Sequence, residues 1–313
     1  MGNSHSGRKE HHGNPNYCNS SHADCIGRNA GAVQHVQHMA QLVATAQAES
    51  SHYYLPDGSP LHGDLRQARK AGAYPSPTTV LGSVLARPGL DNWKQESAIL
   101  QSLTLPRIDG EEDAQFARRV VGASRDDLQA AADRGTYVHT LAEHAVTGKT
   151  PADLKAEFEP HFAALQVFSK FVQKVHHMED VVVNHAEGYA GRVDLICDWG
   201  DKVQTTVEVV DFKTRKFKRL GTPVPDMPGY ASSDDPHKVD SYDTDLIQLA
   251  AYAYAVFDEP VAARSVYIEP KSGAIAYKLW APEQVESAFE VFKHVLAIWR
   301  WQKKYDPREV RCD

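Results

Sequence analysis

The chain has no long run of apolar residues and no excess of positive charge. Its 313 residues are 42% hydrophobic and 24% charged, and its formal net charge is −7 at pH 7. No stretch approaches the roughly 20 consecutive apolar residues of a transmembrane helix. The polar, histidine-rich amino terminus has neither the blocks of a secretory signal nor the arginine-rich pattern of a transit peptide. We therefore expect no membrane association and a cytoplasmic location, in a bacterial cell or a phage-infected host.

Cysteine is scarce and dispersed, at positions 18, 25, 197 and 312. Widely separated cysteines are not typical of a disulfide framework. The first two precede a pair of histidines, which gives the possible zinc ligands Cys18, Cys25, His35 and His38. This set lacks the short spacing between cysteines that structural zinc sites have. We favour a mobile arm over residues 1–50 that includes an amphipathic helix from about Ala32 to Ala48, and an amino-terminal Zn²⁺ site is the alternative.

Two carboxylates and an ammonium group are predicted to converge near the middle of the chain. Asp194 lies in GYAGRVDLICDWG, and Asp211 and Lys213 lie in TTVEVVDFKTRK; both segments are typical of β-strands. Because side chains alternate between the faces of a strand, Asp211 and Lys213 share one face while Phe212 packs into a core on the other. Glu208, three residues before Asp211, is expected on the opposite face and outside the site.

This combination suits the hydrolysis of a phosphodiester. A hard divalent cation with oxygen ligands neutralises phosphoryl charge and activates water. Asp194 and Asp211 are the expected metal ligands, and the backbone carbonyl of Phe212 is a possible third. Lys213 is expected to orient the attacking water or to bind the phosphate. A D-x-K triplet alone is common, so the neighbouring segments decide whether it is catalytic.

Predicted helices flank these two strands. His139 and Glu143 lie four residues apart in RGTYVHTLAEHAVTG, as do Gln248 and Tyr252 in DTDLIQLAAYAYAV, so each pair shares a helix face. The first helix superficially resembles that of a zinc protease. Its spacing, however, is H-x-x-x-E-H through His144, rather than H-E-x-x-H or H-x-x-E-H. The extra residue rotates a ligand by about 100° around the helix, which argues against a peptidase.

These motifs, in this order, resemble the RecB-like branch of the PD-(D/E)XK nucleases, which includes Cas4-type phage exonucleases and the mitochondrial genome maintenance exonuclease. The matching elements are Gly135-x3-His139-x3-Glu143, Gly191-x2-Asp194, Asp211-x-Lys213-Thr214 and Gln248-x3-Tyr252, preceded by YPSPTTVLGSVLARPGLDNWK. The resemblance covers about residues 74–305. It implies an α/β fold with a restriction-endonuclease-like core, in which helices flank a central mixed β-sheet.

The resemblance also implies roles for single residues. His139 is then an additional metal ligand and Glu143 a supporting catalytic acid, while Gln248 and Tyr252 position DNA or the catalytic lysine. Packing alone also explains Tyr252, whereas Gln248 on an apolar helix face needs a polar partner.

Cofactor and partner follow from the same resemblance. Some members of this family carry an iron–sulfur cluster on one upstream cysteine and three clustered downstream cysteines. The chain has no such downstream trio, so we expect no iron–sulfur cluster and expect Mg²⁺ or Mn²⁺ as the cofactor. The expected partner is DNA, because positive charge follows the site despite the net acidity. The groups expected to contact DNA are Gln248, Tyr252, Thr214, Arg215, Lys216 and Lys218.

The chain is predicted to comprise an arm over residues 1–50, a helical segment over 51–130 and a nuclease core over 131–313. In the helical segment, Ser76 or Thr78 is expected to cap a helix that ends at Pro88-Gly89. The core is expected to finish with a hairpin, RSVYIEPKSGAIAYKLW, and a long amphipathic helix, PEQVESAFEVFKHVLAIWRWQKKY. The loop at 220–240 is expected to border the substrate path.

We expect a metal-dependent DNA exonuclease that acts on single strands or duplex ends in recombination, repair or replication, possibly beside a protein partner from those processes. An endonuclease of the same fold is an alternative, because the motifs define the cutting chemistry rather than where cutting begins. A non-catalytic DNA-binding subunit is the other alternative.

Overall fold

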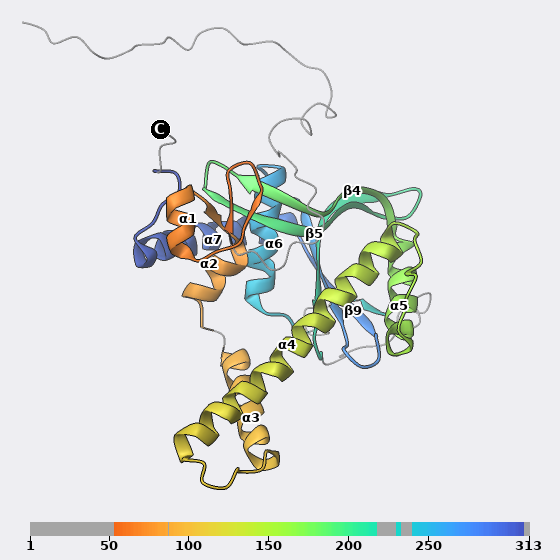
Figure 1. Cartoon of the computed structure of the whole chain (residues 1–313). Coiled ribbons are helices and arrows are strands. Elements are labelled where there is room, and N and C mark those ends of the chain that lie inside the picture. Colours follow the sequence, from red (N-terminus) through yellow and green to blue (C-terminus); the bar gives the residue numbers. More distant parts are fainter. Residues whose placement is uncertain (1–52, 87, 218–229, 233–239, 310–313) are drawn as a thin grey trace, which may run out of the picture. The chain divides into compact units, whose positions relative to one another are not determined.

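The computed structural model describes residues 53–86, 88–217, 230–232 and 240–309 (Figure 1). All of them belong to one unit of the chain, Met39–Asp313. Several predicted features lie outside the described residues: the arm and helix before position 51, the alternative zinc ligands Cys18, Cys25, His35 and His38, the side chain of Lys218, and most of the 220–240 loop.

The central layer is a mixed β-sheet with the strand order β4-β5-β6-β8-β9-β7. Its strands are β4 (Val172–Asn184), β5 (Tyr189–Gly200), β6 (Thr205–Thr214), β8 (Ala262–Ile268), β9 (Ile275–Trp280) and the short β7 (Tyr230–Ser232). The pairs β4–β5, β5–β6 and β8–β9 are antiparallel, whereas β6–β8 and β7–β9 are parallel. The prediction of an α/β fold with a central mixed sheet is confirmed, as is the hairpin from β8 to β9, which turns at Gly273 with a φ of 66°.

Helices cover both faces of this sheet (Figure 1). On one face lie α2 (Pro77–Val84), α6 (Asp243–Val256) and α7 (Pro282–Lys303), and on the other lie α4 (Asp113–Val146) and α5 (Glu159–Ser169). The alternation along β6 separates two cores: Val209 packs in the core of α6 and α7, whereas Val210 and Phe212 pack in the core of α4 and α5. Asp211 and Lys213 therefore face α6, as their spacing predicts.

A second, smaller sheet has the strand order β2-β1-β3, with β1 (Tyr53–Tyr54), β2 (Pro60–Leu61) and β3 (Tyr74–Pro75). The seven-residue helix α1 (Leu65–Ala71) lies between β2 and β3 in the chain. This part is fixed by Tyr305, whose hydroxyl donates to the carbonyls of Ala68 at 3.1 Å and Ala73 at 2.8 Å. The end of the described chain is thereby tied to its beginning.

Two helix boundaries differ from the sequence predictions. Ser76 caps α2 as expected, because its hydroxyl accepts from the backbone of Thr79 at 3.1 Å. The helix already ends at Val84, however, and Pro88 begins a further helix, α3 (Pro88–Thr104). Proline suits the first position of a helix because no intrahelical partner is needed for an N–H group there.

The predicted boundary between residues 130 and 131 falls inside α4, a continuous helix of 34 residues. The carboxy-terminal part of α4 buries Val138, Leu141 and Ala142 against the sheet. Its amino-terminal part runs beside α3, a helix of 17 residues with no buried side chain. None of the helices in the described residues has both the length and the apolar composition needed to cross a lipid bilayer.

Candidate metal centre

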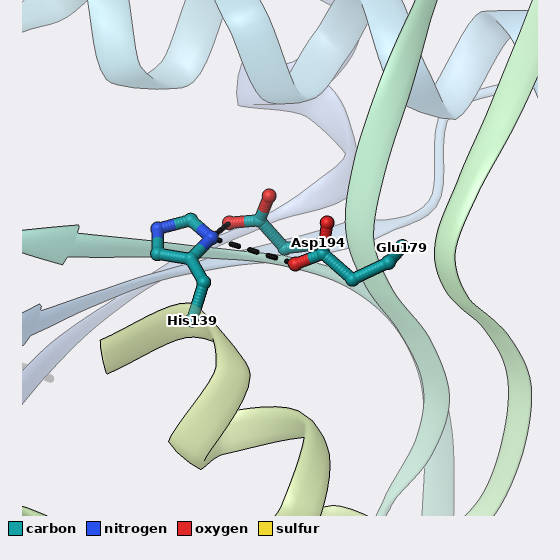
Figure 2. A group of neighbouring side chains, drawn as sticks. All are labelled: His139, Glu179 and Asp194. Carbon is teal, nitrogen blue, oxygen red and sulfur yellow. Dashed lines mark ion pairs between the residues drawn. The ribbon is translucent and has the colours of Figure 1, made fainter. Parts of the chain in front are cut away.

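Three potential metal ligands meet where α4 reaches the sheet (Figure 2). His139 projects from α4, Glu179 from β4 and Asp194 from β5. Nδ1 of His139 lies 3.5 Å from Oε1 of Glu179 and 3.6 Å from Oδ2 of Asp194. The three ligand atoms lie within 4.8 Å of one another, which is close enough for one cation to contact all three.

Glu179 was not predicted as part of the site. It lies between Met178 and Asp180, which pair with Leu195 and Val193, so it is opposite Asp194 on the neighbouring strand. Its φ of 53° is in the left-handed region that non-glycine residues seldom adopt. Backbone strain of this kind concentrates at functional sites. Only the register of β4 against β5 identifies Glu179, and the sequence does not specify that register.

The imidazole of His139 is held from both sides. Its Nε2 lies 2.9 Å from the carbonyl oxygen of Phe212, and we assign the Nε2 proton from this acceptor. The Phe212 carbonyl, predicted as a possible metal ligand, thus accepts a hydrogen bond from the imidazole of His139. Metal-binding histidines commonly donate their other N–H group to a backbone carbonyl, which fixes the ring orientation. Nδ1 is then the atom directed at Glu179 and Asp194 (Figure 2).

Charge on His139 is stabilised by its neighbours. Burial opposes the charged form, but the carboxylates of Asp194 and Glu179 outweigh it and raise the pKa of His139 to about 9. A point where carboxylates hold a side chain in its cationic form also attracts a metal cation. Arg192 contacts the outer oxygen of Glu179 at 3.4 Å and limits the movement of that carboxylate.

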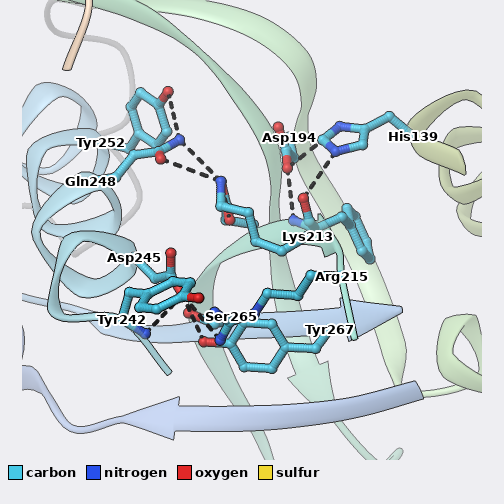
Figure 3. A network of polar contacts seen from close by, with 12 residues as sticks. His139, Asp194, Lys213, Arg215, Tyr242, Asp245, Gln248, Tyr252, Ser265 and Tyr267 are labelled. Carbon is cyan, nitrogen blue, oxygen red and sulfur yellow. Dashed lines mark hydrogen bonds and ion pairs between the residues drawn. The ribbon is translucent and has the colours of Figure 1, made fainter. Parts of the chain in front are cut away.

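A second polar group lies on the α6 side of the sheet (Figure 3). Nζ of Lys213 lies 2.7 Å from Asp211, and the side chain of Gln248 contacts both, at 3.3 Å from Lys213 and 3.1 Å from Asp211. Tyr252 lies 3.2 Å from the Gln248 amide. Gln248 therefore has the polar partners that its position on an apolar helix face requires. Phe212 is only 1% exposed, so the predicted alternation along β6 is confirmed.

Asp194 connects the two groups. Its Oδ2, which faces His139, also accepts the backbone N–H of Phe212 at 2.7 Å, on the strand that carries Asp211 and Lys213. Burial raises the pKa of Asp194, and it raises that of Asp211 to about 7 although Lys213 opposes the rise. Burial would lower the pKa of Lys213, but Asp211 and Asp194 raise it. The surroundings of Asp194 and Asp211 thus favour a positive charge.

The donor set tests whether a cation fits. The groups comprise carboxylates and one imidazole, which suit Mg²⁺ and, with the imidazole, particularly Mn²⁺. Asp211 is 1% exposed, and its Oδ2 is buried with no aligned hydrogen bond, although Nζ of Lys213 lies 2.7 Å away. A buried carboxylate oxygen with spare acceptor capacity is consistent with metal binding. The residues present therefore fit a divalent ion.

The remaining predicted residues lie apart from these contacts. Glu143 is partly buried one turn after His139, and in the described part of the chain no hydrogen bond or ion pair joins its carboxylate to the site. Among the described residues the buried Thr214 hydroxyl has no hydrogen-bond partner, and Lys216 is exposed. Glu208 lies on the opposite face, as expected, where it forms a buried ion pair with Arg264 at 2.6 Å.

Arg215 differs from its prediction as a DNA-binding surface cation. Its guanidinium carbon lies 4.3 Å from the ring centroid of Tyr242 and 4.2 Å from that of Tyr267. The guanidinium also forms an ion pair with Asp245 at 3.6 Å. The guanidinium of Arg215 therefore points toward these residues rather than toward solvent. Each contact offsets part of the hydration that the guanidinium has lost.

The chain matches no protein-family model, and no curated protein is significantly similar to it in sequence.

Proposed function

We propose that the protein is a Mg²⁺- or Mn²⁺-dependent nuclease that hydrolyses phosphodiesters of DNA, starting from strand ends. One observation carries the proposal: the His139–Glu179–Asp194 group and the Asp211–Lys213 pair approach each other from opposite faces of the sheet and are joined through Asp194. Metal-binding carboxylates beside a partly buried ammonium group suit phosphoryl chemistry, in which developing negative charge must be stabilised.

Each residue has a role in this proposal. His139, Glu179, Asp194 and Asp211 would hold the ion, which when bound supplies a Lewis acid and lowers the pKa of a coordinated water. The Lys213 ammonium donates to the attacking water or to a phosphoryl oxygen. Because Asp211 and Lys213 are paired already, little reorganisation is needed when a phosphate arrives.

DNA ends are supported as the substrate by the resemblance of the four motifs to RecB-like nucleases and by the lysine at position 216, which is exposed beyond the end of β6. Net acidity of the chain does not oppose this, because local charge at the site governs phosphate binding.

The test compares end-labelled linear single-stranded DNA, linear duplex DNA and covalently closed circular DNA, each with Mg²⁺ or Mn²⁺. We expect the wild-type protein to degrade linear DNA only, and Lys213→Met to lower the rate about 100-fold or more. The same substitution should leave Mn²⁺ affinity nearly unchanged. Lys202→Met removes an exposed lysine on the β5–β6 loop and should leave the rate unaltered.

Other results decide among the alternatives. Cleavage of circular DNA would show that the protein is an endonuclease. DNA binding without cleavage in the presence of either metal would favour a non-catalytic DNA-binding subunit. Equal rates for Lys213→Met and wild type would contradict the proposed role of the lysine.

A further inference from the structure

A buried network lies beyond the Lys213 site and includes none of the proposed metal ligands (Figure 3). Its centre is Asp245, in the first turn of α6 and only 6% exposed. The carboxylate accepts the hydroxyl of Tyr267 at 2.9 Å and the backbone N–H of Tyr242 at 3.3 Å. Arg215 supplies the opposite charge at 3.6 Å.

The partners of Asp245 come from different elements. Arg215 follows directly after β6, two residues beyond Lys213, and Tyr267 lies on β8. Arg215 is itself anchored, since its backbone N–H donates to the carbonyl of Ile268 at 3.0 Å and its guanidinium donates to the carbonyl of Asp240. The network therefore joins the first turn of α6 to the parallel strands β6 and β8.

The position of Asp245 on α6 connects this network to the candidate site. Asp245 precedes Gln248 by three residues, so the two side chains are neighbours on the helix surface. Gln248 is the residue that contacts Lys213 and Asp211 together. A rotation or shift of α6 that displaced Gln248 would also have to break the contacts of Asp245 with Tyr267 and Arg215.

Simple stabilisation of the fold does not require a network of this kind. Burying a carboxylate and a guanidinium is costly, and apolar side chains of similar volume often stabilise a protein equally well. The charged network adds a fixed orientation, because hydrogen bonds and ion pairs are directional and favour one arrangement of the elements. The lysine, its carboxylate partner and the glutamine need that precision, since small misplacements lower rates strongly.

We propose that Asp245, with Arg215 and Tyr267, is a positioning lock that sets α6, and through Gln248 the Lys213–Asp211 pair, in the reactive arrangement. Asp245 is a positioning residue that touches neither substrate nor metal. The inference rests on the proposed nuclease function for its kinetic consequence, but the geometric link from Asp245 to Gln248 is independent of it.

Tyr267→Phe tests the lock because it removes the tyrosine hydroxyl that donates to Asp245 and leaves the aromatic ring in place. The matched control is Tyr305→Phe, which removes the hydroxyl of another buried tyrosine, with two backbone acceptors, in another part of the molecule. We expect both variants to lower the unfolding midpoint comparably. Tyr267→Phe should lower kcat on linear DNA about 10-fold with little change in KM, whereas Tyr305→Phe should leave kcat as in the wild type.

A second measurement does not depend on activity. In protein labelled with ¹⁵N-glutamine, the side-chain amide of Gln248 is identified by its absence from the spectrum of Gln248→Met. We expect Tyr267→Phe and Asp245→Asn to shift this amide and speed its hydrogen exchange, Arg215→Lys to do so less, and Tyr305→Phe to leave it unchanged.

The two proposals fail differently. If the wild type cuts no DNA while the Gln248 amide responds to Tyr267→Phe, the nuclease proposal fails, but the structural link between Asp245 and Gln248 is supported. If the amide is unaffected by Tyr267→Phe, or if both tyrosine variants lower kcat equally, the network only stabilises the fold and the positioning inference is overturned.

Discussion

At the scale of single residues, Asp211 and His139 keep their protons at pH values where exposed residues of these types have lost them. Burial raises the pKa of Asp211 from 3.8 to about 7. For His139, burial acts in the other direction, but Asp194 and Glu179 raise the pKa from 6.5 to about 9. Each group thus binds its proton more tightly in the folded chain. Without metal, the folded state loses stability as pH rises, between about 4 and 7 through Asp211 and between about 6.5 and 9 through His139.

We therefore predict opposite pH trends with and without metal. In EDTA, the unfolding midpoint should fall as pH rises from 5 to 9, whereas the increase caused by Mn²⁺ should grow over the same range, because protons and metal compete for these ligands. Differential scanning calorimetry measures both trends. His139→Gln should remove the part of the trend above pH 6.5. A midpoint in EDTA that rises with pH would contradict the assignment.

The residues that the sequence identified are those whose roles follow from local periodicity. Alternation along one strand places Asp211 and Lys213 together, and helical spacing places Gln248 on the same face as Tyr252. Glu179 could not be found in this way, because its position depends on the register between two strands. Arg215 was predicted to contact DNA because it belongs to a cluster of positive charge, and that cluster does not show that its guanidinium stacks between Tyr242 and Tyr267.

At the scale of secondary-structure elements, close approach of a helix to a strand depends on a single glycine. Gly191 lies in β5, where a Cβ atom would stand 2.9 Å from the ring of Tyr252 on α6 and 2.9 Å from Pro77 on α2. The ring and the proline cannot both move without disturbing the packing of α2 and α6. Only the absence of a side chain allows these elements to meet.

Gly191→Ala is accordingly predicted to destabilise the protein by about 1–3 kcal/mol and to lower the rate of the proposed DNA cleavage, because a displaced Tyr252 would shift Gln248, to which it is hydrogen-bonded. Gly122→Ala is the matched control: it lies in α4 with open space around the new methyl group, and it should stabilise by about 0.5–1 kcal/mol. Urea unfolding measures both. A neutral Gly191→Ala variant would show that the contact is easily relieved.

On the face of the sheet opposite Asp211, an ion pair links the neighbouring strands β6 and β8. Arg264 on β8 forms its ion pair with Glu208 on β6 between the rings of Trp199 and Tyr277, at 4.3 and 4.5 Å from their centroids. Both charged side chains are almost fully buried. The pair fixes the parallel register that brings Asp211 level with Ser265.

Removing one partner leaves the other charge buried and unpaired. We predict that Arg264→Met lowers the free energy of unfolding by about 3–5 kcal/mol. Lys293→Met, which breaks the exposed pair between Lys293 and Glu290, should lower it far less, because water screens that pair. Denaturant titrations give both values, and a similar loss in the two variants would mean that burial adds little to the Arg264 pair.

At the scale of the described molecule, stability is unevenly distributed. The sheet is packed on both faces, whereas α3 has no buried residue, and Trp93, Leu100 and Leu103 on it are exposed. A helix of this length is marginal in water without packing. Local opening should therefore be easiest in α3 and in the part of α4 beside it.

Hydrogen exchange followed by mass spectrometry tests this distribution. Amides of α3 are predicted to exchange at least about 100-fold faster than those of β5 and β6, since opening of α3 exposes almost no additional apolar surface. Equal protection of α3 and β5 would contradict the prediction.

The arrangement of layers was predictable, but the division of the chain was not. The resemblance of the motifs to a known family implied a mixed sheet flanked by helices, and periodicity indicated the hairpin and the final helix. The boundary expected after residue 130 failed because the helical pattern that contains His139 continues upstream to Asp113 without a proline. Local patterns identify elements but do not show where packing against the sheet ends.

The continuity of α4 has a mechanical consequence. The helix is about 50 Å long at the usual rise per residue. One end pairs with the weakly anchored α3, and near the other end His139 faces Glu179 and Asp194. An α-helix without a proline bends only gently. We therefore expect a displacement of its outer part to tilt the packed turns around Val138 and Leu141, which carry His139.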